Sequence, residues 1–268
     1  MNTIKALVNK YLGFGFSIAD SRTLAAEEII LTKIATSNLA KHVTLKGGIV
    51  MFGLTNNSRR ITQDIDFDLI RYSIDKESLK LFIKKLNNIN DGFKLLINGD
   101  IESLHQQDYQ GARIKIIIED HNKQQLRFKL DVGVHTYYAI EQKEIAFCFE
   151  ENGKTLNVKA NPPEQIFSEK LISLARFGIA STRYKDIYDL YYLIDKKLVS
   201  TNRINSYLQL FFDNSSKMPN NLNDFLNVIE ETLNNSDFEK EASKPVFRWL
   251  DTPYAEIKKA IINFLRKL

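Results

Sequence analysis

Apolar residues in the first part of the chain recur in short segments, several of them with the two-residue period that is typical of strands. These segments are "HVTLKGG", "DIDFDLI", "GFKLLING", "GARIKIIIE", "QLRFKLDVGV" and "TLNVKA". Three helices are expected among them, at "SRTLAAEEIILTKIATSNLAKH", "GIVMFGL" and "DKESLKLFIKKLNNI". Ser21 and Asp75 are plausible N-caps of the first and the third.

From "NPPEQIFSEK" onward the pattern is helical throughout. Pro162 and Pro163 suit a helix start, because proline at the first helical position loses no hydrogen bond. Helices are expected at about residues 162–177, 183–196, 202–212, 221–233 and 254–267. The pattern predicts an α+β fold in two domains. Residues 1–160 form a mixed sheet flanked by helices, and residues 161–268 form a helical bundle.

The composition is that of an ordinary globular protein of 268 residues, with 44% hydrophobic and 26% charged residues. The formal net charge of +4 is compatible with a polyanionic partner such as RNA, but charge alone favours a solvated surface with a small lysine excess. The single cysteine, Cys148, excludes an internal disulfide and fits a reducing compartment. Because it lies in the apolar run "IAFCFE", we expect a buried thiol rather than a nucleophile.

No stretch of about 18 apolar residues occurs, so we expect no membrane span. The first residues, "MNTIKALVNKYLGFGF", contain neither a long apolar segment nor a small-residue cleavage site, which predicts a cytoplasmic protein. The four histidines, His42, His105, His121 and His135, show none of the spacings of a zinc site.

Three acids alternate along one predicted strand, at Asp64, Asp66 and Asp68. Residues two apart in a strand share a face, so the three carboxylates should point the same way. Carboxylates so close together raise each other's pKa unless a cation offsets the repulsion. Mg²⁺ or Mn²⁺ would suit such hard oxygen ligands. A solvent-facing edge strand, charged against aggregation, is an equally good interpretation of this segment alone.

Two further features bear on that choice. Gly47 and Gly48 lie between a short strand and a helix, where glycine allows backbone N–H groups to approach a phosphate. A simple tight turn also accounts for them. Asp131 lies on the polar face of a later strand and is a candidate third ligand, unless it is simply an exposed acid beside Arg127 and Lys129.

The predicted helical half contributes "SEKLISLARFG" and "RYKDIYDLYYL", which contain Lys170, Asp186 and Asp189. Each residue also has a structural explanation. Lys170 could extend its ammonium from the helix to solvent. Asp186 suits a first helical turn. Lys185 and Asp189, four residues apart, could form a surface ion pair.

Taken together, "LKGG", "RRITQDIDFDL", "LDVGV", "SEKL" with "LAR", and "RYKDIYDLYYL" resemble the AbiEii/AbiGii-type toxin nucleotidyltransferases. This family belongs to the DNA polymerase β-like nucleotidyltransferase superfamily. The resemblance covers about residues 43–195 and implies a nucleotidyltransferase domain with a helical domain that completes the active-site cleft.

The resemblance implies a role for each matching residue. Gly47 and Gly48 would hold the triphosphate of a nucleoside triphosphate (NTP). Asp64 and Asp66 would ligate Mg²⁺ or Mn²⁺, with Asp131 as the third acid, which could also help to deprotonate the acceptor. Lys170 would bind the triphosphate, Asp186 would act in catalysis or substrate positioning, and Arg60 could contact phosphate.

One position departs from the family pattern. A small hydroxyl residue commonly follows the two glycines, whereas this chain has Ile49. Phosphate binding would then rest on backbone groups, which leaves open a catalytically degenerate protein that only binds nucleotide or RNA.

The function that the resemblance implies is transfer of a nucleoside monophosphate (NMP) from an NTP to an RNA 3′ end, such as that of tRNA, or to a protein hydroxyl. The protein would be a toxin of a toxin–antitoxin or phage-defence system, with a cognate antitoxin as its partner. An interaction module with an incidental acidic edge is the remaining alternative.

Overall fold

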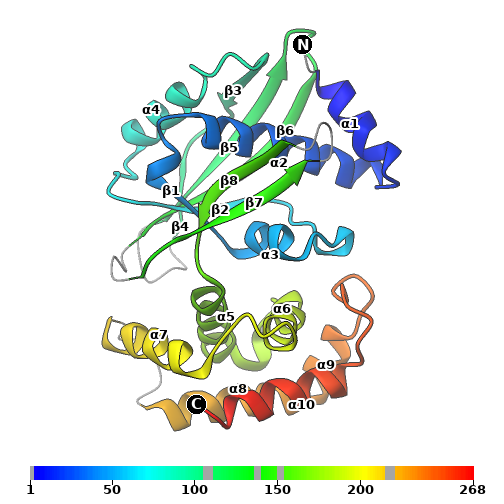
Figure 1. Ribbon diagram of the computed structural model, residues 1–268, viewed down its shortest axis with the longest axis vertical. Helices are drawn as coiled ribbons and strands as arrows, with labels where there is room; N and C mark the ends of the chain where they lie inside the picture. Colours follow the sequence, from blue (N-terminus) through cyan, green and yellow to red (C-terminus); the bar gives the residue numbers. More distant parts are fainter. Residues whose placement is uncertain (1–2, 105–110, 136–139, 150–153, 215–220) are drawn as a thin grey trace. The chain divides into compact units, whose positions relative to one another are not determined.

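The computed structural model describes residues 3–104, 111–135, 140–149, 154–214 and 221–268. The chain forms two compact units, Met1–Asn161 and Pro162–Leu268. The first contains the sheet and the second is helical (Figure 1).

The sheet of the first unit has eight strands and is mixed. Its strands are β1 (Val43–Lys46), β2 (Ile65–Leu69), β3 (Phe93–Ile97), β4 (Glu102–Leu104), β5 (Gly111–Asp120), β6 (Gln125–Val134), β7 (Lys143–Phe149) and β8 (Lys154–Ala160). Their order is β3-β5-β6-β2-β1-β8-β7, with β4 beside β5. The β2–β6 and β1–β8 pairs are parallel, and the other pairs are antiparallel.

In the described part of this unit, the helices beside the sheet are α1 (Ile4–Gly13), α2 (Ile18–Thr36), α3 (Gly47–Thr55) and α4 (Lys76–Leu86), with the 3-10 turns η1 (Ala40–His42) and η2 (Ser58–Arg60). Asp75 caps α4 as predicted. The predicted start of α2 at Ser21 is wrong. The Ser17 side chain accepts the Asp20 N–H, so the helix begins one turn earlier and Ser21 lies buried within it.

The alternating pattern of β6 is confirmed. Leu126, Phe128 and Leu130 are buried on the face against which α2 packs, whereas Arg127 and Lys129 are exposed. Figure 1 shows α2 crossing the sheet on this apolar face. The opposite face of β6 is polar, which matters because Asp131 belongs to it.

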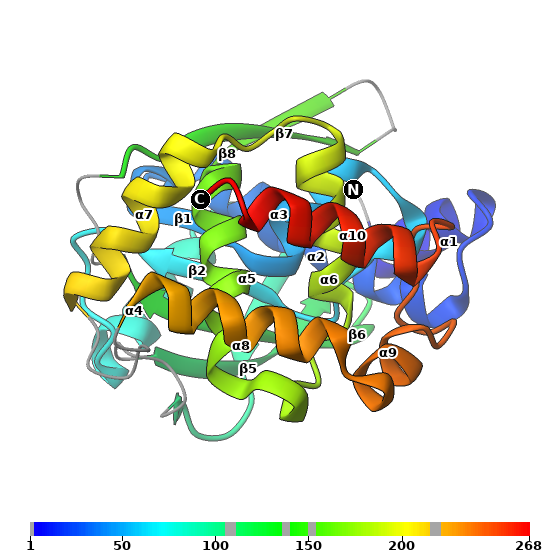
Figure 2. The same ribbon diagram turned by 90° about the horizontal axis from the view of Figure 1, so that it is seen from below.

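The second unit contains α5 (Pro163–Phe177), the turn η3 (Gly178–Ala180), α6 (Lys185–Asp195), α7 (Thr201–Asn214), α8 (Leu222–Asn234), α9 (Ser236–Ala242) and α10 (Tyr254–Leu265). Figure 2 shows these helices from a second direction. Helix α5 packs against α6, α7 and α8, and α10 packs against α6 and α8. The five predicted helices are confirmed, with Pro163 at the first position of α5. Helix α9, with seven residues, was not predicted.

The predicted α+β fold is therefore confirmed. In the described part of the chain, no helix combines the length and the apolarity needed to span a membrane. Cys148 lies in β7, but its side chain, like the whole of His105, is outside the described residues.

Candidate functional site

The glycine pair forms the junction between β1 and α3. Gly47 has a φ of +64°, in the left-handed region that side chains disfavour. A Cβ atom on Gly47 would lie 2.7 Å from Oδ2 of Asp66. In this arrangement the Asp66 carboxylate occupies space that a side chain at position 47 would need, so the glycine does more than form a tight turn.

The second glycine is equally enclosed. A Cβ atom on Gly48 would lie 2.8 Å from Oγ1 of Thr62 and 3.3 Å from a terminal guanidinium nitrogen of Arg60. The Arg60 side chain is buried, which brings a cation to the first turn of α3. Ile49 is buried too, so its side chain packs into the core. An anion at this helix start would be held by backbone N–H groups and the helix dipole, as the sequence predicts.

The two aspartates predicted as metal ligands flank the first residue of β2. Asp64 precedes the strand and accepts a hydrogen bond of 3.0 Å from the Thr62 hydroxyl. Asp66 lies opposite Asp131 across the parallel β2–β6 pair. Both Asp64 and Asp66 are half-buried. Asp68, in contrast, is 3% exposed and accepts a hydrogen bond of 2.6 Å from Nζ of Lys46, so it forms a buried structural ion pair.

Asp131 is bound by an arginine that the sequence did not single out. Arg113 lies directly opposite it on β5, and its Nε and one terminal nitrogen donate to the two carboxylate oxygens at 2.7 and 2.6 Å. The hydrogen bonds to Asp131 raise the pKa of Arg113. The alternative of an exposed acid is wrong, because Asp131 is 8% exposed and its cation is Arg113.

The carboxylates of Asp64, Asp66 and Asp131 fit a divalent cation only in part. Asp64 and Asp66 supply two half-buried carboxylates, and Mg²⁺ commonly takes one or two carboxylates together with substrate phosphates. Asp131 could join only by sharing an oxygen with Arg113. Within the described ranges, no three His, Cys, Asp or Glu side chains are grouped closely enough to hold a metal ion by themselves.

In the second unit, Lys170 of α5 is held by two acids of α6. Its Nζ lies 2.5 Å from an oxygen of Asp186 and 2.9 Å from one of Asp189. Lys170 is 3% exposed and Asp189 is fully buried. The structure therefore contradicts two alternatives, a solvent-directed lysine and a surface pair of Asp189 with Lys185. Burial opposes ionisation of Asp186, but Lys170 and Arg183 outweigh it and lower its pKa.

Glu27 of α2 was also missed. It is 1% exposed, and neither carboxylate oxygen has a hydrogen-bond partner among the described residues. Burial, followed by the charge of Asp64, raises its pKa well above the ordinary value. Nothing in the sequence separates Glu27 from Glu28 beside it, because the burial of Glu27 depends on how α2 packs on the sheet.

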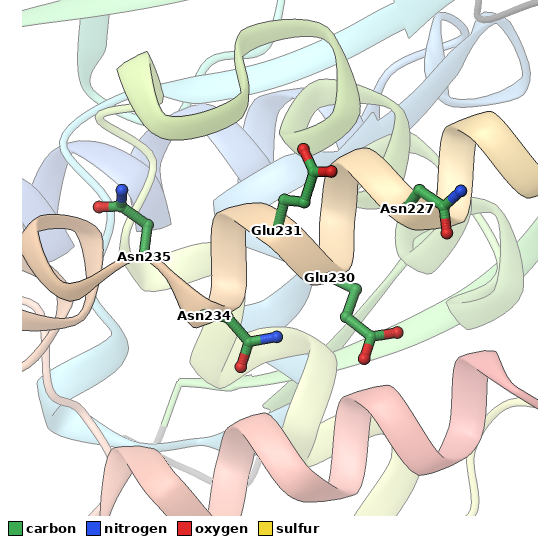
Figure 3. Close-up of a pocket in the computed structure, with 5 residues that line it drawn as sticks. All are labelled: Asn227, Glu230, Glu231, Asn234 and Asn235. Carbon is green, nitrogen blue, oxygen red and sulfur yellow. The ribbon is translucent and has the colours of Figure 1, made fainter.

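A hollow of about 410 Å³ lies along α8 (Figure 3). It is lined by Asn227, Glu230, Glu231, Asn234 and Asn235. Its lining combines two carboxylates with three amides and contains none of the predicted site residues. This chemistry does not suit a triphosphate.

The profile of the family described as nucleotidyl transferase AbiEii toxin, type IV toxin–antitoxin system, matches residues 29–260. The chain belongs to the AbiEii family. The match runs from α2 to α10 and so includes every predicted site residue. The resemblance is confirmed, and this AbiEii chain is a nucleotidyltransferase.

Other comparisons add little. A crystal structure of an antigenic nucleotidyltransferase-like protein from Paracoccidioides brasiliensis matches at 16% identity, over 69% of this chain and 88% of that one, with a TM-score of 0.38. No curated protein matches the AbiEii chain.

Proposed function

We propose that the chain uses Mg²⁺ or Mn²⁺ to transfer an NMP from an NTP to a hydroxyl of an RNA 3′ end or of a protein. One observation carries this proposal. The Asp66 carboxylate lies against Gly47, at 2.7 Å from the position of a Cβ atom. A helix start suited to phosphate and a carboxylate suited to a cation thus occupy the same place.

Each residue of the first unit has a role in this proposal. The backbone N–H groups of Gly47 and Gly48 bind triphosphate oxygens, and the buried Arg60 adds positive charge beside them. Asp64 and Asp66 hold the cation. When bound, the cation neutralises charge on the triphosphate and favours in-line displacement.

Asp131 accepts the proton of the attacking hydroxyl. The acceptor oxygen then bonds to the α-phosphorus as the bond to pyrophosphate breaks, and the pyrophosphate departs. Arg113 fixes the orientation of the carboxylate by its two hydrogen bonds. Each carboxylate oxygen keeps a second lone pair, which leaves room for this proton.

For Lys170 and Asp186 we propose the roles that the family resemblance implies, with Lys170 binding triphosphate and Asp186 positioning it. The local support is the pair of short contacts from the Lys170 ammonium to Asp186 and Asp189. These contacts hold the charged lysine in one orientation.

The family description includes type IV toxin–antitoxin systems, and we infer that the chain is a toxin with a cognate antitoxin. Expression without that antitoxin should arrest growth, and the arrest should require Asp64 and Asp66.

The test is incubation of the purified chain with each α-³²P-labelled NTP, Mg²⁺ or Mn²⁺, and total RNA or lysate, followed by location of the label. The variant Asp64→Ala/Asp66→Ala should lose all transfer. Glu77→Ala/Asp100→Ala removes two exposed carboxylates and should keep it. Equal labelling by the wild type and the first variant would exclude the proposed cation site.

A nucleotide-binding protein without activity is the second candidate. The observation that favours it is Arg113, which engages both oxygens of Asp131. Thermal stabilisation by NTP and Mn²⁺, with no labelled product from any acceptor, would support this candidate.

A further inference from the structure

One edge of β6 is covered along only part of its length. Strand β5 pairs with β6 from Gln125 to Gly133, whereas β2 pairs with it only from Leu130 to Val134. A groove of about 550 Å³ lies at the β6 segment that β2 leaves unpaired. It is lined by Ala19, Arg22 and Thr23 of α2 and by Gln125, Leu126 and Arg127 of β6.

The groove is positively charged. Arg22 and Arg127 are both exposed, and Arg22 donates to the backbone carbonyl of Gln125 at 3.3 Å. Among the residues that the structure describes, neither arginine forms an ion pair with a carboxylate. An exposed guanidinium group without a carboxylate partner can bind a phosphate through two parallel hydrogen bonds.

Further cations lie on the polar face of β6, the face to which Arg127 belongs. Lys129 is two residues from Arg127 and lies directly opposite Lys115 on β5. Like charges that face each other across two strands are destabilising. Glu102 pairs with Lys115 at 2.5 Å, but no carboxylate in the described ranges pairs with Lys129. A polyanion would offset this repulsion.

The groove adjoins the candidate site. The Thr23 hydroxyl lies 3.5 Å from the side-chain oxygen of Gln63, which immediately precedes Asp64. Lys129 and Arg127 share the polar face with Asp131, at about 7 and 14 Å from it along the strand, given a rise of about 3.4 Å per residue. The row of cations therefore begins at the proposed reaction centre and leads away from it.

We infer that this groove, with Arg22, Arg127 and Lys129, binds the phosphodiester backbone of a nucleic-acid acceptor strand. The inference rests on the proposed function and selects RNA from its two acceptor classes. Arg127 and Lys129 on one face of β6, with Arg22 of α2 across the groove, provide several cations close together, which suits a polymer with one negative charge in every repeat. Backbone contacts of this kind hold the strand without reading its sequence.

The test measures equilibrium binding of a short fluorescein-labelled single-stranded RNA by anisotropy, with neither NTP nor divalent cation present. Arg22→Gln/Arg127→Gln is compared with Lys76→Gln/Lys84→Gln, which removes the same charge from exposed positions of α4. With a salt slope of about 0.7 per phosphate contact, loss of two contacts should weaken binding about 25-fold at 0.1 M salt and lower the slope by about 1.4. Lys129→Gln should lower the slope by about 0.7.

The control variant should bind RNA like the wild type, and both double variants should bind NTP normally. Unchanged RNA binding by the arginine variant, or an equal loss in both double variants, would overturn the inference. Loss of NTP binding alone would assign the arginines to the triphosphate instead. Tighter binding of polyglutamate than of RNA would indicate an acidic protein acceptor. The binding assay measures no catalysis. RNA binding by a protein that transfers no NMP would therefore contradict the proposed function but support the inference about the groove.

Discussion

Replacing Glu27 by leucine should stabilise the protein at neutral pH, although it removes an ionisable residue beside the candidate site. The carboxyl group is buried, and both oxygens lack hydrogen-bond partners among the described residues. An unsatisfied buried polar group costs about 1–3 kcal/mol, so we expect a gain of that size in the free energy of unfolding. For a chain of this length, a gain of about 1 kcal/mol corresponds to a rise in Tm of about 2–4 °C.

The pH dependence of this gain is the sharper test. The pKa of Glu27 is raised by burial and by Asp64, so the folded protein holds a proton that the unfolded chain releases. Stability of the wild type should therefore fall as the pH rises above the ordinary glutamate value of about 4.3, until the folded pKa is passed. Glu27→Leu lacks this loss, so its advantage should be smallest at low pH, where only the unsatisfied carboxyl group contributes, and should grow toward neutrality.

The measurement is urea unfolding of wild type and variant from pH 4 to pH 8, with chelator present so that no divalent cation contributes. Glu27→Gln keeps the shape of the side chain without its charge and should show the same pH trend. A difference between variant and wild type that does not change with pH would refute the reasoning, because overpacking alone produces a constant offset.

Three other substitutions test the site. Gly47→Ala combines a left-handed φ with a Cβ clash and should abolish NTP binding in a titration. Gly99→Ala is the control, because Gly99 has a φ of +81° and a Cβ there would meet no neighbour within 4 Å. It should cost only about 1–2 kcal/mol of stability. Arg113→Met leaves the Asp131 carboxylate without its cation and should lower the free energy of unfolding, measured in urea, by about 2–3 kcal/mol. The loss is moderate because the Arg113 side chain is partly exposed. Lys170→Met removes the buried ammonium that Asp186 and Asp189 share, although Arg183 still pairs with Asp186. It should cost about 3–5 kcal/mol in the same assay, and a smaller loss than that of Arg113→Met would contradict the ranking.

Local patterns were sufficient to predict much of the fold. The alternation in β6, the Asp75 cap of α4 and the proline start of α5 depend only on residues within each element. Helices α1 and α9 were missed, and α9 is too short for its apolar period to stand out.

The candidate site was only partly predictable, for a physical reason. The glycine pair and the acidic strand lie close together along the chain, so their contact follows from one strand pairing, that of β1 with β2. The partner of Asp131, in contrast, depends on the register of β5 against β6, which places Arg113 opposite it. A shift of one residue in that register would turn Arg113 to the other face of the sheet.

The contact between Gly47 and Asp66 also constrains how this sequence can change over time. A side chain at position 47 would displace the Asp66 carboxylate, because its Cβ atom would lie 2.7 Å from Oδ2. A substitution at position 47 therefore alters the turn and the position of the acid together. In a descendant that abandoned nucleotide transfer, both positions would be released from selection together, so a paired loss of glycine and aspartate would mark an inactive lineage.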